Sequence, residues 1–186
     1  MSSGGSFDLL TLVSTIDTAV MNVLKSVSSP AVDKMMIFIT KLGDGGAFWI
    51  LLIALMFIFK KYRNTGTVSA VSLASCFLIG NYVVKPLVGR IRPCNVENAA
   101  MLIERMNDFS FPSMHTATAF SISVVVFIKN KLAGSALVIL SLLIGVSRIY
   151  LNVHYFTDVL AGAAFGTVFA LLSVFAAKKL KLIKKL

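Results

Sequence analysis

The sequence predicts an all-α protein: a polytopic membrane helical bundle with five to six transmembrane helices and, before them, N-terminal interfacial helices. The first observation is composition, since 57% of the 186 residues are hydrophobic and the mean hydropathy is +0.86. A soluble domain of this size is usually less apolar. The second is that the apolar residues gather in blocks of about 18 or more, the length that crosses a bilayer. We therefore expect one membrane-embedded domain over residues 1–186.

The N-terminal residues 1–45 are predicted to form interfacial helices on the outer face of the membrane. Residues 7–27 place apolar side chains at helical spacing, but polar residues interrupt every face, which favours an amphipathic helix at the interface. Ser29-Pro30 ends this helix, and residues 31–42 are expected to form a second helix of the same kind. The sequence leaves open that one of these segments crosses the membrane as a sixth span.

Five apolar segments after the Gly43-Asp44-Gly45-Gly46 turn are predicted to cross the membrane and to form the bundle, residues 45–177. In the last of them, Gly162 and Gly166 are spaced for close helix packing through small residues. The predicted spans lie near residues 45–61, 67–84, 112–128, 132–150 and 158–177.

The longest connection between predicted spans is residues 86–111, on the outer side. Loops of this length in a compact domain are usually functional or mobile. Residues 95–107 have the apolar spacing of a short helix. Because the loop links two clusters of polar residues, we expect it to act as a lid over them.

Charge predicts the orientation of the chain. Ten basic residues fall at alternate span ends with no acidic residue among them, whereas all eight acidic residues fall on the opposite side. By the positive-inside rule the basic side is cytoplasmic, and so is the basic tail, residues 178–186. This distribution suits an anionic inner leaflet and not a nucleic acid, although the net charge is +10. The ten are Lys60, Lys61, Arg63, Lys129, Lys131, Lys178, Lys179, Lys181, Lys184 and Lys185.

Six ionisable side chains are predicted to lie at one level, at span ends on the outer side. Charged groups near hydrocarbon are costly and usually functional. Each of the six alone has an ordinary explanation, such as headgroup anchoring, and only the joint pattern indicates a phosphate site. They are Lys85, Arg92, His115, Arg148, His154 and Asp158.

The residue types in this group fit phosphate chemistry. A helix that starts after Ser113 presents free N–H groups, including that of Met114, to an anion. His154 and Asp158 are four residues apart and are expected to share one helix face, so that the carboxylate sets the imidazole tautomer and leaves the other nitrogen as a nucleophile. His115 is then the general acid for the leaving oxygen.

Two cysteines, Cys76 and Cys94, provide neither a disulfide framework nor a Cys/His metal-binding spacing. This absence fits the expectation of no metal and no cofactor, which comes from the family resemblance described next.

The polar clusters resemble the tripartite signature of the type 2 phosphatidic acid phosphatase (PAP2) superfamily, and the resemblance covers residues ~45–177. The order of the three parts and the spacing within each part match that signature. The parts are Lys85-x6-Arg92-Pro93, Pro112-Ser113-x-His115 and Ser147-Arg148-x5-His154-x3-Asp158.

This resemblance implies a reaction and a role for each matching residue. His154 is implied to be the nucleophile that forms a phospho-histidine, Asp158 orients it, and His115 acts first as acid and then as base. The family needs no metal. The residues implied to hold the phosphoryl group are Lys85, Arg92, Ser113 and Arg148.

One position departs from the family pattern, because Met114 stands where the family usually has glycine. Glycine lets a backbone N–H approach phosphate closely. Met114 can still donate its N–H from a helix start, but its side chain needs room, either in the headgroup space or against the outer loop.

By this resemblance we expect an integral-membrane lipid phosphatase in the plasma membrane, acting on a lipid phosphate of the outer leaflet. Undecaprenyl diphosphate is the expected substrate, since three cations and a helix start suffice for a bare diphosphate. Alternatives are a phosphatidylglycerol phosphate or phosphatidic acid phosphatase, a lipid phosphotransferase, and a non-enzymatic lipid-phosphate binder or transporter. The sequence leaves the oligomeric state open.

Overall fold

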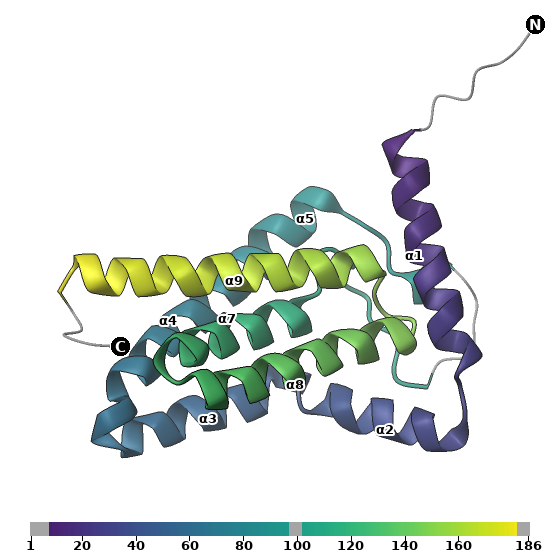
Figure 1. The fold of residues 1–186 in the computed structure, drawn as a ribbon. Helices are drawn as coiled ribbons and strands as arrows, with labels where there is room; N and C mark the ends of the chain where they lie inside the picture. The colour runs from purple at the N-terminus through teal and green to yellow at the C-terminus, as the bar shows by residue number, and fades with distance from the viewer. Residues whose placement is uncertain (1–7, 97–101, 182–186) are drawn as a thin grey trace, which may run out of the picture.

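The structure is a computed structural model that describes residues 8–96 and 102–181, which are mainly helical and include no strand. Figure 1 shows the long helices packed side by side, with α1 crossing one end of the bundle. The elements are α1 (Leu9–Ser26), α2 (Pro30–Lys41), η1 (Asp44–Gly46), α3 (Ala47–Ile58), η2 (Lys60–Tyr62), α4 (Arg63–Ile79), the π-helical η3 (Gly80–Val84), α5 (Lys85–Val88), α6 (Pro93–Val96), α7 (Met114–Lys129), α8 (Lys131–Tyr150) and α9 (Phe156–Lys179).

All five segments predicted as spans form helices, but fewer meet a length and hydropathy test for crossing a membrane. Three helical stretches do so, Lys60–Val96, Lys131–Tyr150 and Phe156–Lys179. A fourth span results if Pro30–Lys41 and Asp44–Ile58, bent by 44° at their junction, form one broken span. The prediction of an all-helical membrane protein is thus confirmed, while five to six spans and interfacial N-terminal helices remain predictions.

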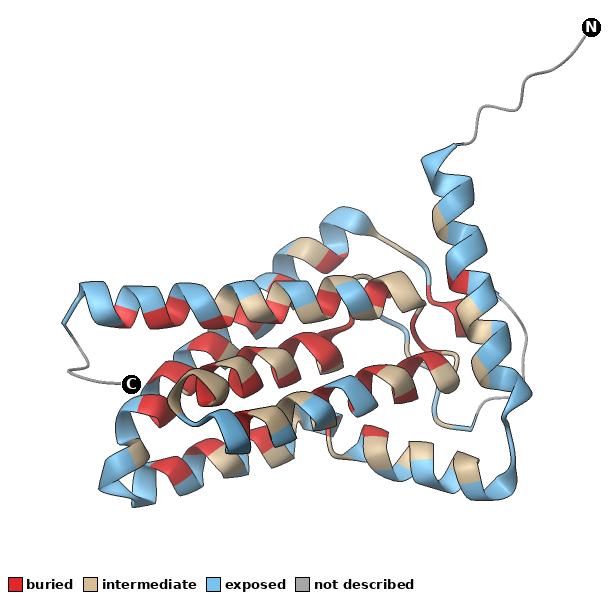
Figure 2. Cartoon of the chain, viewed as in Figure 1, coloured by how far each residue is buried: buried red, intermediate tan, exposed pale blue. Residues whose placement is uncertain are grey.

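Helix α7 is the centre of the bundle and the most buried helix in Figure 2. Helices α4, α8 and α9 pack around it. A Cβ atom at Gly166 would lie 2.1 Å from the carbonyl oxygen of Ala117, and one at Gly162 would lie 2.5 Å from that of Ser113. The α9 backbone therefore rests directly on α7, which confirms the predicted close packing through small residues. Close packing at this point holds the start of α9 against the start of α7.

The outer faces of α8 and α9 carry large apolar side chains, among them Leu142, Leu171 and Phe175, that are more than half exposed. Such faces are unusual on a soluble protein and ordinary on a helix that faces lipid.

The connection after α4 differs from its prediction. The expected helix over residues 95–107 is wrong for residues 102–107, which are not helical, and residues 97–101 lie outside the described part. Instead, short helices α5 and α6 flank a segment without regular secondary structure at residues 89–92. Residues 108–113 then return across the bundle end to start α7, where Ser110 N–H donates to the Arg90 carbonyl at 2.7 Å. This return places loop residues among the predicted site residues.

Candidate active site

The structure brings the six predicted ionisable residues together at one end of the bundle. Lys85 begins α5, His115 lies in the first turn of α7, Arg148 lies in the last turn of α8, and Asp158 lies in the first turn of α9. Arg92 and His154 come from the segments that join these helices. A cavity of about 600 Å³ opens here, and its polar end is lined by Lys85, Arg92, Asp108, Met114, His115 and His154.

His154 is completely buried, and hydrogen bonds define its tautomer. Arg92 Nη1 lies 2.9 Å from Nε2, and a guanidinium can only donate, so Nε2 accepts and the proton is on Nδ1. Burial, and then the positive charges of Arg92 and Arg148, hold the pKa of His154 well below its usual range. The ring is therefore neutral at physiological pH, with its lone pair on the nitrogen that faces the cations.

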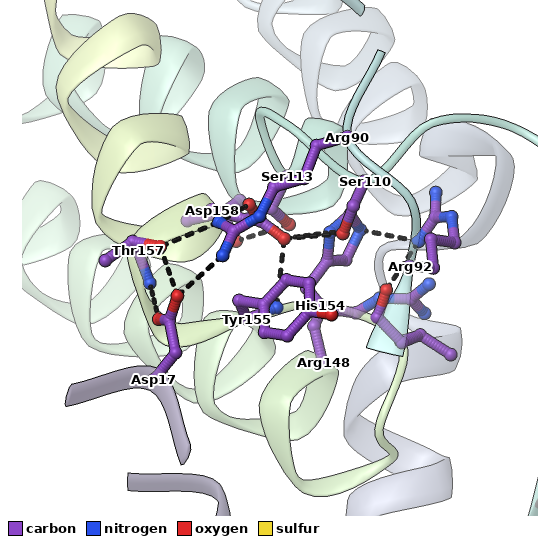
Figure 3. A network of polar contacts seen from close by, with 12 residues as sticks. Asp17, Arg90, Arg92, Ser110, Ser113, Arg148, His154, Tyr155, Thr157 and Asp158 are labelled. Carbon is purple, nitrogen blue, oxygen red and sulfur yellow. Dashed lines mark hydrogen bonds and ion pairs between the residues drawn. The ribbon is translucent and has the colours of Figure 1, made fainter. Parts of the chain in front are cut away.

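The contact between His154 and Asp158 differs from the prediction of a shared helix face, which is wrong because α9 begins only at Phe156. Nδ1 lies 3.5 Å from Asp158 Oδ2, longer than a good hydrogen bond. Ser110 fills the gap, with its Oγ 3.3 Å from Nδ1 and 2.5 Å from Asp158 Oδ2 (Figure 3). Because the carboxylate can only accept, the chain of donors runs from His154 through Ser110 to Asp158.

Asp108 is a second residue that sequence reasoning missed. Its carboxylate accepts from Arg92 Nη2 at 2.8 Å and pairs with Lys85. Burial raises the pKa of Asp108, but the hydrogen bond from Lys85 and the charge of Arg92 outweigh it, and the pKa lies below its usual range. The Asp108 carboxylate thus already forms ion pairs with Lys85 and Arg92, two of the cations predicted to hold phosphate. The 86–111 loop therefore contributes directly to the site.

Asp44 is a third residue that sequence reasoning missed, and it begins η1, the short helical turn directly before α3. His115 Nε2 lies 3.0 Å from Asp44 Oδ1. The turn approaches closely because Gly43 has no side chain: a Cβ there would lie 2.9 Å from His115 Cδ2. Each histidine of the site is thus linked to a carboxylate, His115 directly and His154 through Ser110.

Arg148 is fully buried behind the cavity wall. Its Nη1 donates to Thr40 Oγ1 at 2.7 Å, and its Nη2 lies 3.0 Å from Met106 Sδ. Within the described part of the chain, its buried Nε–H has no hydrogen-bond partner. Arg148 is not among the residues that line the cavity, so its role in holding phosphate stays a prediction.

Ser113 and Met114 form the start of α7. Ser113 is its N-cap residue, as predicted, although its hydroxyl pairs with Thr116 Oγ1 at 3.0 Å rather than with a backbone N–H. The Met114 side chain packs with Cys76 and Ala117, and a Cβ at Gly80 would lie 2.4 Å from its sulfur. It therefore packs against the α4–η3 helix, not against the outer loop as one prediction allowed, while still lining the cavity.

Three comparisons relate the chain to known proteins. The model of the PAP2 superfamily matches residues 50–181. An undecaprenyl-diphosphatase of Sulfolobus acidocaldarius is 32% identical over 142 residues, which cover 75% of this chain and 68% of the relative. Undecaprenyl-diphosphatase BcrC of Bacillus subtilis is 31% identical over 140 residues, 75% of this chain and 72% of the relative. The crystal structure of a transmembrane PAP2-type phosphatidylglycerolphosphate phosphatase from Bacillus subtilis has a TM-score of 0.76 at 28% identity, covering 90% of this chain and 87% of that one.

Proposed function

The chain belongs to the PAP2 superfamily of membrane lipid phosphatases, and on this premise we propose that it hydrolyses a lipid diphosphate, with undecaprenyl diphosphate as the preferred substrate. The observation that carries the proposal is the shape of the cavity. Its polar end holds the cations and histidines, and the remainder is lined by apolar side chains of α3 and α4, among them Ile53, Leu73 and Phe77. A phosphate headgroup with one long apolar chain fits both parts.

The cavity follows the continuous helical stretch of α4 and η3, from Lys85 at the start of α5 back to Ala70. Fifteen residues of helix correspond to roughly 22 Å, enough for several isoprene units of a single extended chain. The headgroup of a polyprenyl diphosphate has no glycerol to recognise. Lys85, Arg92 and Arg148 with the start of α7 can therefore bind it by charge and N–H donors alone.

The proposed reaction uses the two histidines in turn. His154 Nε2 attacks the terminal phosphorus, the bond from that phosphorus to the bridging oxygen breaks, and His115 protonates that oxygen as the lipid monophosphate leaves. Water, deprotonated by His115, then attacks the phospho-histidine and releases inorganic phosphate. Arg92 moves its donors from His154 Nε2 and Asp108 to the phosphoryl oxygens, which keeps the positive charge at the site where negative charge develops. No step requires a metal.

A substrate panel in detergent micelles tests this proposal by phosphate release. We expect kcat/KM for undecaprenyl diphosphate to exceed that for phosphatidylglycerol phosphate and phosphatidic acid by at least about tenfold, or about 1.4 kcal/mol of transition-state stabilisation. A higher value for either phospholipid would reassign the substrate. Phosphate recovered on an added lipid alcohol instead of in solution would indicate a phosphotransferase, and binding without any release would indicate a binder or transporter.

The proposed location is the plasma membrane with the site at the outer leaflet, which the asymmetry of basic residues supports. Single cysteines at Val96 and Lys131, both exposed, mark the two sides. In intact cells an impermeant thiol reagent should label Val96→Cys and leave Lys131→Cys unlabelled until the membrane is permeabilised. Native Cys76 and Cys94 are buried, so their background is low. The reverse pattern would place the site on the cytoplasmic side.

A further inference from the structure

Helix α1 contributes a buried carboxylate to the site region, although it lies outside the part of the chain that the family model matches. Asp17 is only 1% exposed in a helix whose other described residues are mostly accessible. Its Oδ1 accepts the backbone N–H of Thr157 at 2.8 Å, and its Oδ2 accepts the Thr157 hydroxyl at 2.8 Å. Asp17 therefore binds the first turn of α9, next to Asp158.

Arg90 joins Asp17 to Asp158. Its Nη2 donates to Asp17 Oδ2 at 2.7 Å, and its Nη1 donates to Asp158 Oδ1 at 2.6 Å and to the Thr157 hydroxyl at 2.8 Å. The guanidinium carbon of Arg90 lies 3.9 Å from the centre of the Tyr155 ring, so a cation–π contact also holds the guanidinium group in place. Figure 3 shows the guanidinium between the two carboxylates.

The two oxygens of Asp158 have separate partners. Oδ1 faces Arg90, whereas Oδ2 accepts from the Tyr155 backbone N–H at 2.9 Å and from Ser110, which leads to His154. A carboxylate held at both oxygens cannot rotate. Its orientation toward Ser110 and His154 is therefore set in part by Arg90.

Charge explains why a second carboxylate accompanies Arg90. An arginine paired with Asp158 alone would neutralise the negative charge that His154 needs when its ring becomes positive during phosphoryl transfer. With Asp17 present, two carboxylates share one guanidinium and the cluster keeps a net charge of −1. Asp17 thus lets Arg90 hold Asp158 without cancelling its charge.

We propose that Asp17 and Arg90 are positioning residues for phosphoryl transfer, which orient Asp158 and preserve its negative charge toward His154. This inference rests on the proposed function of His154. It adds helix α1 to the machinery of the enzyme, because the carboxylate that balances Arg90 comes from that helix. Neither residue touches the substrate cavity.

The test uses charge-removing variants of the full-length protein in detergent: Asp17→Asn, Arg90→Gln and the double variant. The matched control is Asp33→Asn in α2, whose carboxylate contacts Tyr150 and Ser28 and not the site. We expect Asp17→Asn and Arg90→Gln to lower kcat by about 10- to 100-fold, the range for residues that support a reacting group, with KM changed less than about threefold. Asp33→Asn should keep the parental kcat.

The pH profile separates positioning from mere stability. The acid limb of kcat/KM reports protonation of the free nucleophile. Removing the negative charge of Asp17 disfavours a protonated His154, so the limb should move to lower pH, while removing the positive charge of Arg90 should move it to higher pH, each by about half a unit or more. The double variant, which restores the net charge of the cluster, should return near the parental limb. The charged groups that face His154, which are Asp158, Arg92, Arg148, Lys85 and His115, are the same in every variant.

Both single variants lose one partner of a buried ion pair, so thermal unfolding midpoints are measured alongside. If Asp17→Asn does not fold, Thr157→Val removes the shared hydroxyl without changing any charge and should lower kcat several-fold at constant KM. The inference would be overturned if the acid limbs of the kcat/KM profiles of Asp17→Asn and Arg90→Gln coincided with that of Asp33→Asn. An unchanged kcat in Thr157→Val would also overturn it. Turnover that persists in His154→Ala would overturn the proposed function instead, so the two failures are distinguishable.

Discussion

Replacing His154 with alanine should abolish phosphate release, with a loss of about 10⁴-fold or more in kcat, the scale for removing a nucleophile. Within the described cavity lining, His154 Nε2 lies among the cations and carries the ring's lone pair, since the tautomer places the proton on Nδ1; the proposed shift of Arg92 to the phosphate frees that lone pair. The loss should be equal for the lipid diphosphate and for a soluble aryl phosphate, because both must form the same phospho-enzyme. Phosphate release from each substrate measures it.

Detection of the phospho-histidine intermediate provides the control for the His154→Ala experiment. Wild-type protein quenched during turnover of ³²P-labelled substrate should carry acid-labile, alkali-stable phosphate, as expected of a phospho-histidine, and His154→Ala should carry none. Addition of a chelator should change neither result. Residual turnover within tenfold of wild type, or strong inhibition by the chelator, would contradict the metal-free covalent mechanism.

Replacing His115 with alanine should produce a loss that depends on the leaving group. A general acid contributes about 10²- to 10⁴-fold when the departing oxygen is basic and little when it is not. We therefore expect the largest loss with phosphatidic acid, which releases an alkoxide, a smaller loss with the diphosphate, and the smallest with an activated aryl phosphate. Steady-state kcat values for the three substrates measure the gradient.

Asp44→Asn supplies a graded comparison for this experiment, because it keeps His115 and weakens only the contact at 3.0 Å. It should show the same order of substrates with smaller losses. Equal losses on all three substrates in His115→Ala would assign His115 to phosphate binding and not to proton transfer.

Local patterns predicted much of this molecule. Apolar blocks predicted helices at the right places, because a backbone in hydrocarbon must satisfy its own hydrogen bonds and the helix does so within one segment. Gly162 and Gly166 predicted a close contact, and the structure shows the backbone of α7 against both. Span ends on one side predicted which charged residues meet, since bilayer thickness sets a common level for them.

The errors have a common physical origin. Residues 95–107 have apolar spacing, but residues 102–107 are not helical. Met106 lines the cavity instead, and Asp108 beyond it pairs with Lys85 and Arg92. His154 and Asp158 have helical spacing in a chain that is not yet helical at His154. The periodicity of apolar residues indicates which secondary structure a segment would form by itself. Buried charged groups must be paired, and their partners come from distant parts of the chain.

The sequence by itself determined the all-helical membrane class, the identity of the histidines and the cations that surround them, because these follow from local hydropathy and from residue type at span ends. Only the tertiary structure decided which polar side chain supports which reacting group. Ser110 between His154 and Asp158, Asp44 on His115, and Asp17 with Arg90 behind Asp158 join segments up to 140 residues apart. A single polar residue in a loop or on an amphipathic helix carries no periodic signal, and its partner is determined only when the helices pack and the buried charges must be balanced.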